Sequence, residues 1–175
     1  MKFIFSFVVF FFFLNCLATA QTLIQNYCKE ATTTDPDFNY DICVQYLEKD
    51  PQSKNATNLK ELVIAITKNA ASKSTTVKGI AEEILKKNLT HGIESSLRDC
   101  VEFFDDVNDS LNDTLRFVDL GNYKDGNFAL STALTNLGTC EDGFKEVDTK
   151  SPISNETDVL HQLIHIDLDF SGMLK

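Results

Sequence analysis

Three groups of side chains in this 175-residue sequence have types and spacings that could support chemistry: a histidine pair, an acidic run and the cysteines. His161 and His165 are four residues apart, so both would lie on one face of a helix and could share a metal ion, with Asp169 as the nearest third ligand. The segment lacks the Glu that a zinc protease carries after its first His. We therefore expect a structural role for both His residues and no metal site.

The acidic run from Asp105 to Asp109 suggests calcium, but it does not follow the EF-hand pattern. Counting from Asp106, Leu111 stands where that loop needs Gly, and Phe117 where it needs Glu. A solvated helix face is the better interpretation. The sequence also contains no nucleophile elbow, no phosphate-binding loop and no dinucleotide-binding glycine motif. It predicts no catalytic residue and no cofactor, and it argues against an enzyme.

The cysteines have to be counted after a predicted leader is removed. Residues 1–20 have the pattern of a secretory signal peptide, because Lys2 precedes an apolar run over residues 3–14 and Ala18-Thr-Ala20 is a cleavage signature. The run is too short to span a bilayer. Cleavage removes Cys16. The remaining cysteines are even in number, which predicts disulfides in a secreted chain: Cys28, Cys43, Cys100 and Cys140.

Glycosylation motifs agree with secretion, and the net charge restricts the kind of partner. Five sequons have their acceptors at Asn55, Asn88, Asn108, Asn112 and Asn155. Asn108 and Asn112 are neighbours on a predicted helix, so steric conflict disfavours sugars on both. The net charge of −10 argues against a nucleic-acid partner and against anionic membranes.

The apolar residues recur at helical spacing along almost the whole chain, and all three Pro fall between periodic segments. Two short helices are predicted over residues 22–34 and 39–49. Four longer helices follow, over residues 58–87, 93–118, 124–144 and 155–174. We therefore expect an all-α fold, in which a short helical hairpin (residues 21–57) precedes an up-down-up-down four-helix bundle (residues 58–175).

This arrangement predicts how the cysteines pair. Cys28 and Cys43 lie on the two short helices, on either side of a break at residues 35–37. Cys100 and Cys140 lie at similar distances before and after Gly121, where the second and third long helices are joined. Antiparallel helices bring both to the same height. Cys28–Cys43 and Cys100–Cys140 are the expected disulfides.

Several segments in order resemble the plant invertase and pectin methylesterase inhibitor family. They are the Asp35-Pro-Asp-Phe-Asn-Tyr-Asp41 segment between the first two Cys, Leu47-x-x-Asp50-Pro51-x-Ser53, Cys100, Leu120-Gly-Asn-Tyr123 and Gly138-Thr-Cys-Glu-Asp-Gly-Phe144. The resemblance implies the same hairpin and bundle, the same disulfides, a plant source, and secretion to the apoplast, the cell wall or the vacuole. It also implies a partner, either pectin methylesterase or acid invertase, bound in a 1:1 complex.

The resemblance also implies which residues contact the target. Invertase inhibitors of the family insert a Pro-Lys-Phe segment into the enzyme's cleft, and this falls on Tyr123, Lys124 and Asp125 here, so only the Lys is retained. In pectin methylesterase inhibitors, polar residues around the third-helix Cys take part, here Thr139 and Asp142. We therefore expect a secreted inhibitor that blocks an active-site cleft, with pectin methylesterase slightly favoured over acid invertase. The alternative is a non-inhibitory extracellular module that binds a small ligand or another protein.

Overall fold

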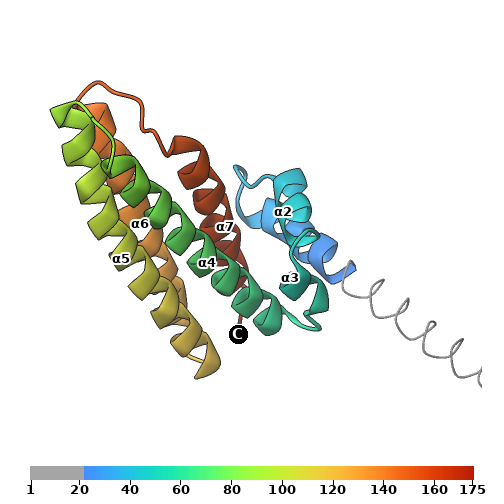
Figure 1. The fold of residues 1–175 in the computed structure, drawn as a ribbon. Helices are drawn as coiled ribbons and strands as arrows, with labels where there is room; N and C mark the ends of the chain where they lie inside the picture. Colours follow the sequence, from blue (N-terminus) through green and yellow to red (C-terminus); the bar gives the residue numbers. More distant parts are fainter. Residues whose placement is uncertain (1–21) are drawn as a thin grey trace, which may run out of the picture. The chain divides into compact units, whose positions relative to one another are not determined.

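The computed structural model describes residues 22–175, and all regular secondary structure in this range is helical. Helical residues 22–34 are followed by α2 (Tyr40–Leu47), α3 (Pro51–Asn55), α4 (Leu59–Leu85), α5 (His91–Asp119), α6 (Tyr123–Glu146) and α7 (Ser154–Gly172) (Figure 1). The predicted all-α class is confirmed. The predicted signal peptide lies outside the described residues. Within residues 22–175, no helix is both long and apolar enough to cross a membrane.

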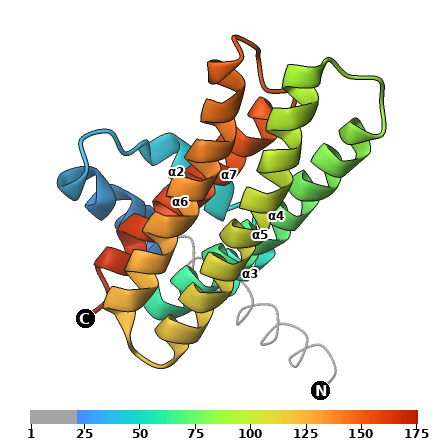
Figure 2. The same cartoon turned by 90° about the vertical axis from the view of Figure 1, so that its left-hand side faces the viewer.

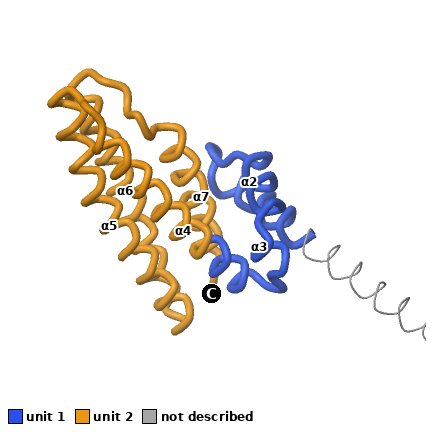
Figure 3. Tube along the Cα trace, in the orientation of Figure 1, with its two compact units in different colours: residues 1–66 blue, residues 67–175 orange. Residues whose placement is uncertain are grey.

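The chain divides into two compact units, and the boundary falls inside α4, between Ile66 and Thr67 (Figure 3). The first unit contains the predicted hairpin, whose two helices are joined by the Cys28–Cys43 disulfide with its Cα atoms 5.9 Å apart. The predicted domain boundary after residue 57 stays a prediction.

Helix α3 is one element that the sequence interpretation missed, because no helix was expected between the one ending at residue 49 and the one beginning at residue 58. Asp50 is its N-cap: its Oδ2 accepts hydrogen bonds from the Ser53 backbone N–H at 2.7 Å and from the Ser53 hydroxyl at 2.7 Å. Pro51 occupies the first helical position, where its missing N–H costs nothing. The Asp-Pro-x-Ser motif thus starts a short helix instead of ending one.

The second unit holds the four-helix bundle, in which α4, α5, α6 and α7 run alongside one another (Figures 1 and 2). Its core is built from the apolar stripes that the periodicity predicts, and it includes the fully buried side chains of Val77, Leu97, Phe104, Leu111, Leu130, Phe144 and Phe170. The predicted Cys100–Cys140 disulfide joins α5 to α6, with the two Cα atoms 4.6 Å apart.

The turn between α5 and α6 depends on Gly121, whose φ of 76° lies in the left-handed region that L side chains rarely adopt. The Asn122 N–H donates to the Phe117 carbonyl at 2.8 Å, and the Gly121 N–H donates to the Val118 carbonyl at 3.2 Å. These two bonds form a Schellman cap. The cap ends α5 within one residue and lets α6 start at Tyr123, directly alongside it.

Candidate docking face on helix α6

Helix α6 differs from α4, α5 and α7 because it carries no charged residue over a long stretch, from Gly126 to Cys140. Its outward residues recur at spacings of three and four and form one exposed strip, which we call the α6 face. The α6 face consists of Lys124, Phe128, Ser131, Thr135, Thr139 and Asp142. Phe128 is 75% exposed, which is unusual for a large aromatic side chain. Depletion of charge around an exposed aromatic residue is typical of the centre of a protein-binding surface.

The hydroxyl groups of this face are oriented by the helix itself. Ser131, Thr135 and Thr139 each donate to the carbonyl four residues earlier, at 3.1, 3.0 and 2.8 Å. Because each hydroxyl hydrogen is engaged, the outward surface presents Thr methyl groups and oxygen lone pairs. A partner therefore meets a mildly apolar surface that accepts hydrogen bonds.

On its α5 side, helix α6 is held by close backbone contacts. The Ser96 hydroxyl donates to the Gly143 carbonyl at 3.0 Å, near the Cys100–Cys140 disulfide. At the other end of the pair, a Cβ placed on Gly126 would lie 3.2 Å from Cγ2 of Val118, so glycine permits the close approach of the helices there.

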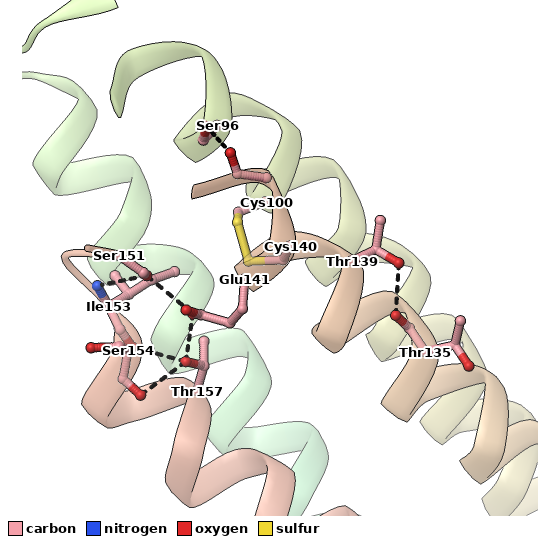
Figure 4. Close-up of a disulfide and its surroundings, with 11 residues drawn as sticks. Ser96, Cys100, Thr135, Thr139, Cys140, Glu141, Ser151, Ile153, Ser154 and Thr157 are labelled. Carbon is pink, nitrogen blue, oxygen red and sulfur yellow. Dashed lines mark hydrogen bonds between the residues drawn. A yellow bond between two sulfur atoms is a disulfide. The ribbon is translucent and has the colours of Figure 1, made fainter. Parts of the chain in front are cut away.

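On its α7 side, helix α6 is held through Glu141, the residue that follows the disulfide. Its Oε1 accepts from the hydroxyls of Ser151 at 3.0 Å and Thr157 at 2.6 Å, which connects α6 to the start of α7 (Figure 4). Figure 4 also shows Thr135 and Thr139 on the side of α6 turned away from this network. Farther along, the Asn127 side-chain amide donates to the Leu168 carbonyl at 2.9 Å. Contacts on both flanks make the α6 face rigid.

The structure brings three of the five predicted target contacts onto this face. Lys124, Thr139 and Asp142 share it, whereas Tyr123 and Asp125 each lie about 100° around the helix from Lys124. The Asp125 Oδ2 accepts from the Asn122 side chain at 2.5 Å, and the Asp142 Oδ1 accepts from Lys145 at 2.6 Å.

The sequence interpretation passed over the three middle members of the face, Phe128, Ser131 and Thr135. Their signal was the uncharged stretch itself, because an exposed helix in a chain with 24% charged residues would ordinarily carry several charges.

The other groups that suggested chemistry lie away from this face. The ring centroids of His161 and His165 are 6.2 Å apart on α7. Partial burial, and secondarily the neighbouring His165, lowers the pKa of His161, while Asp158 opposes the shift. The acidic residues of the run, Asp105, Asp106 and Asp109, are exposed on α5, where Asp105 accepts from Lys78 of α4 at 2.5 Å.

Residues 22–175 thus form a helical protein with two disulfides, one in each unit. Comparison with known proteins assigns its class: the plant invertase/pectin methylesterase inhibitor family matches residues 22–169, and the chain belongs to that family. The members of this family are enzyme inhibitors, so the prediction that the chain is no enzyme is confirmed.

Individual relatives agree with this assignment. The chain is 48% identical to Pectinesterase inhibitor 12 of Arabidopsis thaliana over 174 residues, covering 99% of this chain and 100% of the relative. It is 32% identical, over 99% of both chains, to a protein of Platanus acerifolia whose name assigns it provisionally to the invertase inhibitors. A crystal structure of a mutant pectin methylesterase inhibitor from Arabidopsis matches the fold with a TM-score of 0.71 at 20% identity, covering 78% of this chain and 91% of the other.

Proposed function

We propose that this protein is a secreted inhibitor of pectin methylesterase that acts in the plant cell wall. It would place the α6 face over the active-site cleft of the enzyme and exclude the substrate without any catalytic step. The observation that carries this proposal is the uncharged, exposed strip on α6, in a chain that shares 48% of its residues with a named pectinesterase inhibitor. A rigid surface suits this role because it loses less conformational entropy on binding.

Acid invertase is the second candidate, favoured by the exposed Lys124 and by the Platanus relative. In this structure Lys124 belongs to the first turn of α6, where Tyr123 precedes it in place of a proline and Asp125 follows it in place of an apolar residue. An ammonium group alone supplies less contact area than an aromatic anchor such as Phe128. Pectin methylesterase is therefore the target that we favour.

The target is tested by titrating the purified secreted protein against pectin methylesterase and acid invertase at pH 5–6. We expect pectin methylesterase activity to fall in proportion to added inhibitor and to reach its minimum at a 1:1 ratio. Loss of invertase activity alone would move the target to the second candidate. Absence of inhibition of both enzymes at micromolar protein would reject the inhibitor function.

The docking face is tested by introducing a charge at its centre. Thr135→Glu should weaken inhibition by about 30-fold or more, because burying an unpaired carboxylate in an interface costs at least about 2 kcal/mol. Thr75→Glu on α4 is the matched control, because Thr75 is also exposed and donates to the carbonyl four residues earlier at 3.0 Å. Equal effects of the two variants, or no effect of Thr135→Glu, would place the interface elsewhere.

A further inference from the structure

The two histidines of α7 lie outside the apolar core of the second unit. The buried apolar side chains of α7 occupy one side of the helix and include Leu160, Ile164 and Phe170. His161 and His165 lie on the other side, where His161 is exposed and His165 is half-buried. A role in the core therefore does not explain why two of the three His residues of the chain are placed one helical turn apart.

The two imidazole rings are close to the separation that a shared metal ion requires. Their ring centroids are 6.2 Å apart, and the ring planes are tilted by 31°. With metal–nitrogen bonds of about 2.0 Å at a roughly tetrahedral angle, the centroids of two coordinating rings lie about 5 Å apart. The remaining gap is about 1 Å, and rotation of the exposed His161 side chain closes it.

A carboxylate accompanies each of the two rings. One ring nitrogen of His165 and one carboxylate oxygen of Asp169 lie within 4.8 Å of each other. Asp158 lies one turn before His161, and its negative charge acts on that imidazole. In metal sites a carboxylate beside a ligand His fixes the orientation of the ring. The four side chains follow one another along α7 as carboxylate, imidazole, imidazole and carboxylate, and the two negative charges also attract a cation.

The missing Glu of the zinc-protease motif does not exclude a metal ion on α7. In that motif the two His bind the ion, whereas the Glu is the general base of the reaction. Gln162 follows His161 here, so α7 has the binding pair without the catalytic group. The expectation of no metal site rested on that motif, and the geometry of the pair now points to metal binding without catalysis.

We propose that His161 and His165 bind one divalent transition metal ion, copper or zinc, through one ring nitrogen each. Asp158 and Asp169 orient the two rings. Imidazole is a preferred ligand of both ions, and water molecules complete the coordination. The ion links two successive turns of α7, so metal binding stabilises this helix in its folded form. The proposal does not depend on which enzyme the protein inhibits.

The test is a metal titration of the full secreted chain, purified without a polyhistidine tag and freed of metal. Isothermal titration calorimetry at pH 7 should show one site per chain for Cu²⁺ or Zn²⁺, with a dissociation constant below about 100 μM. Electron paramagnetic resonance of the protein with Cu²⁺ should show couplings to two imidazole nitrogens. A weaker dissociation constant for both ions, or a Cu²⁺ spectrum without these couplings, would overturn the assignment.

Variants of the three histidines locate the ion, and circular dichroism of each metal-free variant checks that the fold is retained. His161→Gln or His165→Gln should weaken binding at least about tenfold, because the remaining imidazole then acts without its neighbour. His91→Gln is the matched control and should leave binding unchanged, since His91 is exposed and Ser95 stands four residues after it. Equal affinities of His91→Gln and His161→Gln would place the ion elsewhere.

Asp169→Asn tests whether this carboxylate orients the site. Binding should weaken by about tenfold, while the Cu²⁺ spectrum still shows two imidazole nitrogens. An unchanged affinity would refute the orienting role of Asp169.

Discussion

Replacement of Asp167 by Asn should change how the stability of the bundle depends on pH. Asp167 lies on α7 and is fully buried. Its Oδ2 is 2.6 Å from the Thr67 hydroxyl of α4, and among residues 22–175 its Oδ1 has no hydrogen-bond partner. Burial raises the pKa of Asp167 well above its usual value, and the Thr67 hydrogen bond only partly opposes this shift. No charged neighbour contributes, so the folded protein favours the neutral carboxyl group.

The direction of the pH dependence follows from whether Asp167 keeps its proton in the folded and in the unfolded chain. The unfolded chain releases the Asp167 proton above pH of about 4, whereas the folded chain retains it. Unfolding then releases a proton, so the free energy of unfolding falls as pH rises through the interval between the two pKa values. The slope is about 1.4 kcal/mol per pH unit for as long as the folded carboxyl stays protonated. At pH values below this interval, Asp167 makes its full contribution to the free energy of unfolding.

Asn cannot ionise, and it keeps an oxygen that can accept from Thr67. Relative to the wild type, the free energy of unfolding of Asp167→Asn should therefore rise by about 1.4 kcal/mol for each pH unit within that interval. Urea unfolding followed by circular dichroism at half-unit steps from pH 4 to 7.5, with both disulfides intact, measures the difference. Asp142→Asn, at an exposed position, is the control and should leave the profile nearly unchanged. Parallel pH profiles for the wild type and Asp167→Asn would show that the reasoning about the buried carboxyl is wrong.

Substitutions at Glu141, at the Cys100–Cys140 disulfide and at Lys124 test the contacts that hold α6 and the edge of the α6 face. Glu141→Ala should lower the free energy of unfolding by about 2 kcal/mol because two hydroxyl groups lose a charged acceptor, and Glu141→Gln by about half as much, as measured by urea unfolding. The double change Cys100→Ser and Cys140→Ser should cost about 4 kcal/mol on the chain-entropy model, with a lower thermal midpoint as the readout. Lys124→Thr creates a sequon at Asn122, so the glycosylated variant should inhibit far less than Lys124→Ala, and enzymatic removal of the sugar should make the two equal.

The helices and the disulfides could be predicted from the sequence because their signals are local or follow directly from helix length. The spacing of the apolar residues identified the four long helices. Antiparallel packing of two of these helices was then enough to predict the disulfide between Cys100 and Cys140, which lie on either side of Gly121. The α6 face could be predicted only in part. Lys124, Thr139 and Asp142 share it because of helical phase, and the same phase turns Tyr123 and Asp125 away.

Asp167 shows where such prediction stops. In the sequence it is one of four acidic residues of α7, and although Ile166 and Leu168 flank it, charge alone predicts exposure. Its burial depends on Thr67, a residue 100 positions away whose hydroxyl meets the carboxyl only after α4 and α7 have packed. Helix periodicity cannot identify a polar contact between two particular side chains on different helices, because either residue alone would be equally compatible with a solvated position.

Helix α6 uses one set of residues to contact the neighbouring helices and another set to form its outer face. The supporting contacts use Cys140, Glu141 and Asn127 together with backbone carbonyls of α6, all on its inner sides. The hydroxyls of the outer face bond only to carbonyls of their own helix among the hydrogen bonds described for residues 22–175. A substitution such as Thr135→Glu therefore removes no contact between helices and should change stability by less than about 0.5 kcal/mol while it alters binding. Because the face can vary without loss of the fold, one bundle architecture is able to serve inhibitors of different enzymes.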